Sequence, residues 1–183
     1  AVAYIFLFFF RGWGQLAAVI SVATVISYLT GPVSAVVLRR TAPDMHRPLR
    51  LPGLHLLAPL AFMFATLVLY WARWPLTGWI ILLMVVALPV WMYYEAKRGW
   101  EDIKLHMRGA WWMVCYLPTI ALLSWLGSSQ FGGLDLIPYG WDQATVAVAG
   151  LGFYFWGMRT GWHTQHVESA RALSMEGAMG PSN

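Results

Sequence analysis

The first long apolar segment of the chain carries polar and small side chains that recur at spacings of three and four residues. On a helix, these spacings bring side chains to one face. Hydroxyl and phenol groups on such a face can exchange hydrogen bonds with a polar solute, so the face could line a solute path or a gate. The competing interpretation is that its small residues let a neighbouring helix pack closely. The members of this face are Ser21, Thr24, Ser27, Tyr28, Gly31 and Ser34.

Gly31 and Pro32 stand together inside the same segment. A proline within a helix removes one backbone hydrogen bond and bends the helix, and the freed carbonyl then needs another partner or water. Such a point suits a gate. A face that packs against a moving helix is also where a gate would operate, so the two interpretations are compatible.

Histidine and cysteine offer little chemistry. His163 and His166 are three residues apart and could share a metal ion, but no third ligand is near, so we predict a solvated tail and no metal site. His46 and His55 fall in or beside a basic loop, where we expect solvent or lipid headgroups around them. Cys115 lies within an apolar segment, and we interpret it as a small apolar filler.

The carboxylates form no catalytic pair. Glu95, followed by Lys97 and Arg98, closes an apolar segment, whereas a proton relay would need a carboxylate deeper in the membrane. Asp135 and Asp142 lie in or beside a glycine-rich connection, and we predict that both are solvated. The sequence contains no GxSxG, HExxH, GxxxxGKS/T or CxxC motif. We therefore predict no enzymatic activity and no cofactor.

Long apolar runs must position these residues. A helix needs about 20 mostly apolar residues to cross a hydrocarbon core that is roughly 30 Å thick. The chain holds four complete runs and a more broken fifth, and the predicted spanning helices are 15–38, 54–71, 76–94, 109–126 and 141–158. We expect residues 1–9 to be the outer half of a truncated helix and 159–183 to be a cytoplasmic tail. The predicted fold is all-α, a polytopic transmembrane helix bundle.

The composition agrees with a membrane protein. Hydrophobic residues make up 59% of the chain and charged residues 11%, against roughly 25% charged in a typical soluble domain. Trp and Tyr favour the headgroup level of a bilayer, and many of them cluster at the ends of the apolar runs. We place in these interfacial belts Trp13, Tyr70, Trp71, Trp74, Trp79, Trp91, Tyr93, Tyr94, Trp100, Trp111, Trp112, Tyr139, Trp141, Trp156 and Trp162.

The basic residues predict an orientation. Ten Lys and Arg residues fall in the segments 39–53 and 95–108 and in the tail from 159, and the other two are Arg11 and Arg73. Cytoplasmic loops carry an excess of Lys and Arg, so we predict that these three segments, including the C-terminus, are cytoplasmic. The predicted external segments are 10–14, 72–75 and 127–138.

The segment after the first run holds the most specific string of the chain. It joins a Ser-Tyr…Gly-Pro helix to Leu-Arg-Arg, Pro-Asp, Arg-Pro-Leu-Arg and Pro-Gly steps. Its residues are Gly31, Pro32, Arg39, Arg40, Pro43, Asp44, Arg47, Pro48, Arg50, Pro52 and Gly53. This string resembles the tenth helix and following loop of bacterial amino-acid permeases in the amino acid–polyamine–organocation superfamily. Leu49 stands where that family often has Phe, and the specific match covers about residues 8–75.

The resemblance implies the C-terminal part of an inverted-repeat, broken-helix transporter, from the tenth helix onward, in the bacterial inner membrane. Two helices beyond the usual twelve are similar to the fourteen-helix aspartate–proton symporter type. In such folds the substrate meets half-helix termini near the bilayer midplane. The family's half-helices are the first and sixth, which have no counterpart among these residues. The polar face could therefore contribute only a gate or a pathway surface.

Two functions remain open from the sequence. The first is a secondary active transporter, a permease of amino acids or related organic solutes. Its partners would be membrane lipid, an amino acid and a coupling proton, because no ATP-binding motif is present. The second is a non-transporting membrane subunit that scaffolds a partner. Nucleic acid is not predicted as a partner, since the basic residues lie in loops between apolar runs.

Overall fold

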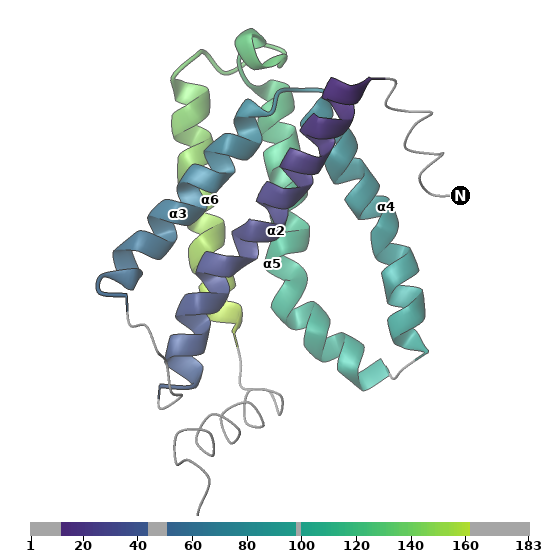
Figure 1. Cartoon of the computed structure of the whole chain (residues 1–183), viewed down its shortest axis with the longest axis vertical. Helices are drawn as coiled ribbons and strands as arrows, with labels where there is room; N and C mark the ends of the chain where they lie inside the picture. Colours follow the sequence, from purple (N-terminus) through teal and green to yellow (C-terminus); the bar gives the residue numbers. More distant parts are fainter. Residues whose placement is uncertain (1–11, 44–50, 98–99, 162–183) are drawn as a thin grey trace, which may run out of the picture.

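The computed structural model describes residues 12–43, 51–97 and 100–161, and every regular element within these ranges is helical. Consecutive long helices run antiparallel between the two ends of a bundle (Figure 1). The elements are α2 (Trp13–Thr41), α3 (Leu54–Trp71), α4 (Leu76–Ala96), α5 (Trp100–Leu126), the short 3₁₀ helix η1 (Ser129–Phe131) and α6 (Trp141–Thr160). The prediction of an all-α polytopic bundle is confirmed.

Four of these helices are long and apolar enough to cross a membrane, namely Trp13–Thr41, Leu54–Trp71, Leu76–Tyr94 and Gly109–Leu126. They correspond to the first four predicted runs. Helix α6 forms over the fifth predicted run but is not one of these four. Its first turn contains Asp142 and Gln143, and glycine recurs along it, so its sequence is less apolar.

Helix α5 begins earlier than the sequence analysis expected. The segment 95–108 was treated as a connection, but the structure continues α5 back to Trp100. Residues 101–108 include Glu, Lys, Leu, Met and Arg, which all favour helix, and the following Gly109 costs only about 1 kcal/mol in a helix interior. Good helix formers therefore extend the helix beyond its apolar portion.

The core forms where α2, α3, α5 and α6 meet. Helix α2 packs on α3, α3 on α6, and α6 on α5, while α4 lies at the edge against α5 and α2 (Figure 1). Phe62 of α3 is fully buried at the centre, with ring centroids 6.0 Å from Trp112, 5.5 Å from Tyr116 and 5.8 Å from Tyr154. These tilted and edge-on contacts are the favoured geometry of aromatic pairs. Trp112 was predicted in the interfacial belts, and in the structure its ring is buried against Phe62.

Glycine lets α6 approach its neighbours closely. A Cβ atom added at Gly150 would lie 3.0 Å from the Thr66 hydroxyl oxygen of α3. A Cβ added at Gly157 would lie 2.9 Å from the Trp112 ring of α5. Small residues at such contacts are typical of membrane helices, which pack through van der Waals contact because lipid tails are as apolar as the side chains.

The connections at one end of the bundle pack against each other; this end was predicted to be external and is called the outer end below. The link between α3 and α4 and the loop before α6 lie at the same end (Figure 1). The Trp74 backbone N–H donates to the Phe131 carbonyl at 2.8 Å. Gly132 has a φ of 81°, and a Cβ there would meet the Trp74 carbonyl oxygen, so only glycine fits this crossing.

Replacing Gly150 with Val should destabilise the protein, because the added side chain has no room beside Thr66. Overpacking of this kind costs about 1–3 kcal/mol. Thermal unfolding in detergent measures the effect. Gly152→Val is the matched control, since Gly152 lies on the same helix and a Cβ there meets nothing within 4 Å. Equal losses in the two variants would contradict the proposed close packing of α6 on α3.

Candidate functional site

The polar face predicted from the sequence is a continuous stripe on α2 that no other described helix covers. We call it the polar stripe, and its members, all exposed, are Ser21, Thr24, Ser27, Tyr28, Gly31 and Ser34. The buried residues of α2 lie on the opposite side of the helix and face the core; they are Val19, Val22, Ile26, Leu29 and Val33. Tyr28 is 71% exposed, and a Cβ added at Gly31 would meet nothing within 4 Å. Close packing of another helix on this face is therefore not seen among the described residues.

Three of the five hydroxyl groups of the polar stripe bond to their own helix. Ser21 donates to the Ala17 carbonyl at 2.9 Å, Thr24 to Ile20 at 2.8 Å and Ser27 to Ala23 at 3.0 Å. These bonds satisfy the hydroxyl protons without water, which matters in lipid. The hydroxyl oxygens keep lone pairs with which they can accept hydrogen bonds from a solute.

Pro32 adds a free acceptor beside the stripe. Because proline has no N–H, the carbonyl of Tyr28 loses its usual partner one turn earlier. This carbonyl lies near the middle of α2, where the Tyr28 side chain faces outward and Gly31 is also exposed. The stripe therefore combines several hydroxyl oxygens with one backbone carbonyl that is available to a ligand or to an adjustment of the helix.

Two hollows border the ends of the polar stripe. Near Ser34, a cavity of about 530 Å³ lies between α2, α5 and α6, and the hydroxyl-bearing residues Thr30, Thr41 and Thr160 also line it. Near Ser21, a smaller cavity of about 340 Å³ lies between α2, α3 and the start of α4, and its lining is mainly apolar. The first hollow has more hydroxyl-bearing residues in its lining and lies at the end of α2 that was predicted to be cytoplasmic.

A buried carboxylate near the outer end of the bundle was missed by the sequence analysis. Asp142 was predicted to be solvated, but its side chain is only 1% exposed. Its Oδ2 accepts a hydrogen bond from the Tyr70 hydroxyl at 2.6 Å and one from the Ser128 backbone N–H at 3.4 Å. Its Oδ1 accepts from the N–H groups of Gly140 at 2.9 Å and Gln143 at 2.6 Å. Four donors replace the water that solvation would have supplied.

This carboxylate joins three parts of the chain. Tyr70 ends α3, Ser128 follows α5, and Asp142 lies in the first turn of α6, where the positive end of the helix dipole favours an anion. Tyr70 was predicted in an interfacial belt; its side chain is fully buried, and its hydroxyl bonds to Asp142. A Cβ at Gly127 would collide with the Tyr70 hydroxyl, so glycine at that position makes room for the contact. The only advance signal was an acidic residue close to a helix start.

A second buried polar contact lies deeper in the bundle. The Tyr116 hydroxyl of α5 donates to the Thr66 Oγ1 of α3 at 3.0 Å, and Thr66 donates to the Phe62 carbonyl at 2.8 Å. Both side chains are fully buried. All the protons of this chain of bonds are used internally, so it fixes α3 against α5 and offers no free group for a solute.

The string from Gly31 to Gly53, which resembles amino-acid permeases, lies only partly within the described ranges. Arg39 donates from Nη1 to the Leu51 carbonyl at 3.1 Å, which ties the end of α2 to the start of the α3 segment. Gly53 precedes α3 with a φ of 72°, a left-handed conformation that suits glycine. Pro43 and Pro52 lie on either side of residues 44–50, which are outside the described ranges. Gly31, Pro32 and Arg40 belong to α2. The predicted positions that fall outside the described residues are Asp44, His46, Arg47, Pro48 and Arg50.

The remaining candidates stay at the edge of the described bundle or lie outside it. His55 and Asp135 are exposed, and the Asp135 Oδ1 accepts from the Ser129 N–H at 3.2 Å. Cys115 is half-buried, and Lys97 places its Nζ 4.7 Å from the centre of the Tyr93 ring.

No group of three possible metal ligands occurs in residues 12–43, 51–97 and 100–161. His163, His166 and the tail lie beyond the described ranges, as does the side chain of Glu95.

Comparison with known proteins relates this chain to amino-acid transporters. It is 49% identical over 175 residues to the glutamate/serine transporter AimA of Bacillus subtilis (strain 168), a match that covers 96% of this chain and 32% of the relative. It is 32% identical over 155 residues to the aspartate-proton symporter of the same organism, covering 83% of this chain and 29% of that relative. The chain thus spans about a third of the length of these curated relatives. No family model and no solved structure matches it.

The Tyr70–Asp142 contact should be energetically coupled. In a double-mutant cycle with Tyr70→Phe and Asp142→Asn, we expect an interaction free energy of about 1 kcal/mol, because polar contacts in membrane helices average slightly less and reach about 1.7 kcal/mol. Thermal unfolding of the four proteins in detergent measures this coupling. A second cycle that pairs Tyr70→Phe with Asp135→Asn serves as the control and should be additive. Additivity in both cycles would show that the hydroxyl and the carboxylate act independently.

Proposed function

We propose that this chain forms part of a secondary active transporter of amino acids, in which the polar stripe of α2 borders the solute path or its gate. The observation that carries the proposal is the 49% identity to a glutamate/serine transporter over nearly the whole chain. The geometry supports the proposal, since α2 buries one side in the bundle and leaves its polar side uncovered by the described helices.

The polar stripe suits a pathway surface better than a lipid-facing one. Hydroxyl and carbonyl oxygens form no hydrogen bonds with acyl chains. A polar solute can donate hydrogen bonds to these oxygens without breaking the bonds that the helix already makes. The relatives are about three times as long as the matched region, so much of each has no counterpart here. We assign the principal substrate contacts to that remaining portion, and to the stripe a supporting role beside it.

The names of the relatives guide the choice of substrate and coupling ion. One is called a glutamate/serine transporter and the other an aspartate-proton symporter. We propose that this transporter carries small amino acids of these kinds and that a proton gradient drives it. We further propose that it resides in a bacterial plasma membrane, with α6 as a fifth crossing and the chain's C-terminus in the cytoplasm, as the distribution of basic residues predicts.

Uptake measurements test both the activity and the role of the polar stripe. The whole transporter, reconstituted into proteoliposomes with an inward proton gradient, should accumulate labelled glutamate, serine or aspartate. Thr24→Val should lower kcat/KM about threefold to tenfold, the effect of losing one hydrogen bond. Thr145→Val is a close control, because Thr145 is also exposed and also donates to the carbonyl four residues earlier at 2.8 Å. A complete lack of uptake would favour the scaffold function, and equal effects of the two variants would remove the stripe from the path.

The proposed orientation can be tested by cysteine labelling. With Cys115 replaced by Ala, a membrane-impermeant maleimide added to intact cells should label Gln130→Cys, which lies in η1 at the end of the bundle proposed to be external. The same reagent should spare Lys104→Cys, near the start of α5 at the opposite end. Opening the cells should make Lys104→Cys reactive, which controls for accessibility. Labelling of Lys104→Cys in intact cells would reverse the assigned topology.

A further inference from the structure

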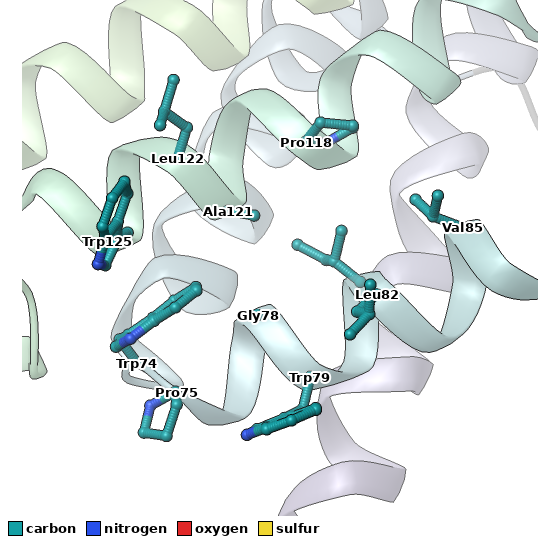
Figure 2. A pocket seen from close by; sticks show the side chains of 11 residues that line it. Trp74, Pro75, Gly78, Trp79, Leu82, Val85, Pro118, Ala121, Leu122 and Trp125 are labelled. Atoms are coloured by element: carbon teal, nitrogen blue, oxygen red, sulfur yellow. The ribbon is translucent and has the colours of Figure 1, made fainter.

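An apolar groove lies between α4 and α5. It has a volume of about 550 Å³ and is open on one side. Its apolar part is lined by Leu82 and Val85 of α4 and by Pro118 and Leu122 of α5 (Figure 2). Three tryptophans, Trp74, Trp79 and Trp125, line the remainder. The groove shares no residue with the polar stripe and plays no part in the proposed solute path.

The groove is lined almost entirely by apolar surface, and its indole nitrogens lie toward one end, which is called the polar end below. In Figure 2 the indole nitrogens of Trp74, Trp79 and Trp125 all lie toward the same end of the groove, away from Val85 and Pro118. None of the three indole N–H groups has a hydrogen-bond partner within residues 12–43, 51–97 and 100–161. Unused indole donors beside an apolar slot match the chemistry of an amphipathic ligand, since indole N–H groups seek polar partners at the membrane interface.

The backbone holds this polar end in place. The Trp74 N–H bonds to the Phe131 carbonyl, which anchors the residue to the loop after α5. A Cβ at Gly78 would collide with the Trp74 ring, so the glycine lets the ring lie directly against α4 (Figure 2). The Trp74 side chain is therefore positioned by its neighbours and does not depend on a ligand to hold it.

A cation stands next to the polar end. Arg73 directly precedes Trp74 and is exposed, and its backbone adopts a left-handed φ of 71°. Such a conformation is uncommon for a residue other than glycine. The Arg73 carbonyl accepts a hydrogen bond from the Thr77 N–H, and the Thr77 hydroxyl lies 3.3 Å from both the Arg73 and the Leu69 carbonyl. The exposed guanidinium of the residue that directly precedes Trp74 supplies the positive charge and the paired donors that suit a phosphate oxygen pair.

The length of the groove fits a lipid tail. At 1.5 Å per helical residue, Pro75 to Val85 spans about 15 Å along α4, which is about half the thickness of a hydrocarbon core. The polar end lies at the α3–α4 link, a membrane-interface position, and the apolar end therefore reaches toward the bilayer midplane. An acyl chain that enters from the lipid gains van der Waals contact with the groove walls, even though no hydrophobic driving force exists between lipid and protein.

We propose that the α4–α5 groove is a binding site for one phospholipid molecule, whose acyl chain fills the apolar part and whose phosphate is bound by Arg73 and the indole N–H groups. The charge complementarity between phosphate and guanidinium, together with the unused indole donors, distinguishes this ligand from a purely apolar helix of another protein. An anionic phospholipid should bind more tightly than a zwitterionic one because of the net charge of its headgroup.

Photo-crosslinking tests the site directly. The whole protein is reconstituted into phosphatidylcholine vesicles that contain a few per cent of phosphatidylglycerol with a diazirine on one acyl chain, then irradiated, digested and mapped by mass spectrometry. We expect adducts to concentrate on residues 78–85 and 118–125. Labelling that is spread evenly over the lipid-facing helices would overturn the proposal. So would an absence of label from the groove, which would show that another segment of the protein or a second copy covers it.

Two adjacent leucines provide a matched pair of variants. Leu82 and Leu83 are 51% and 47% exposed on the same helix, but only Leu82 lines the groove. Leu82→Trp should fill the slot and reduce groove adducts at least about fivefold, while Leu83→Trp should leave them within about twofold. Equal labelling of the two variants would refute the assignment of the acyl chain to this groove.

The headgroup contact has an independent test that does not require changing the groove wall. Arg73→Gln should reduce groove labelling by phosphatidylglycerol about fivefold, the factor that one basic residue contributes near an anionic surface. Arg73→Lys should retain most of it. If both variants label like the original protein, Arg73 does not bind the phosphate and the proposed headgroup site is wrong. Amino-acid uptake is not needed for the measurement, so its result stands apart from that of the transport proposal.

Discussion

A chain that crosses a bilayer finds no water for its backbone N–H and C=O groups, and most features of this structure follow from that constraint. The described segments satisfy it with long helices and short links. The same constraint acts on polar side chains. Serine and threonine along α2 return their protons to carbonyls of the same helix, at 2.8–3.0 Å in Ser21, Thr24 and Ser27. These three residues thus present oxygen atoms to their surroundings while their own protons are already bonded.

Asp142 shows the same constraint at the outer end of the bundle. A buried carboxylate is costly unless several donors surround it, and here one hydroxyl and three backbone N–H groups do so. These donors come from α3, from the loop after α5 and from α6. The need of the Asp142 carboxylate for hydrogen-bond donors therefore fixes how these three segments pack together. The glycines at 127 and 132 leave the space that this arrangement needs.

The bundle presents two uncovered surfaces with different chemistry. The polar stripe of α2 offers hydroxyl oxygens and the Tyr28 carbonyl, which suit a polar solute or a partner helix that moves. The α4–α5 groove offers an apolar slot with indole donors at one end, which suits a lipid. Helix α4 itself buries few residues in the bundle and lies at its edge, so it can serve the groove without disturbing the core around Phe62. The surfaces proposed for solute and for lipid therefore share no residue.

The sequence by itself determined the helical class, the four strongest spans and the polar face of α2, because each depends on local properties. Run length and a repeat of three to four residues are written along a single segment, and neither needs knowledge of its neighbours. Even there, α5 extended to Trp100, since helix propensity continues past the apolar run that marks a crossing. The resemblance of the basic string to amino-acid permeases likewise agrees with the relation to two transporters.

Only the tertiary structure decided which polar and aromatic residues are buried. Asp142 and Asp135 look alike in sequence, each a lone acid near a glycine-rich loop, yet one is enclosed and the other is exposed. The difference arises because Tyr70, 72 residues before Asp142 in the chain, folds onto it. Trp112 and Trp111 are neighbours, but the rotation of α5 turns the first into the core and the second outward. Burial depends on which distant segments pack together, and residue type and local spacing do not indicate which segments these are.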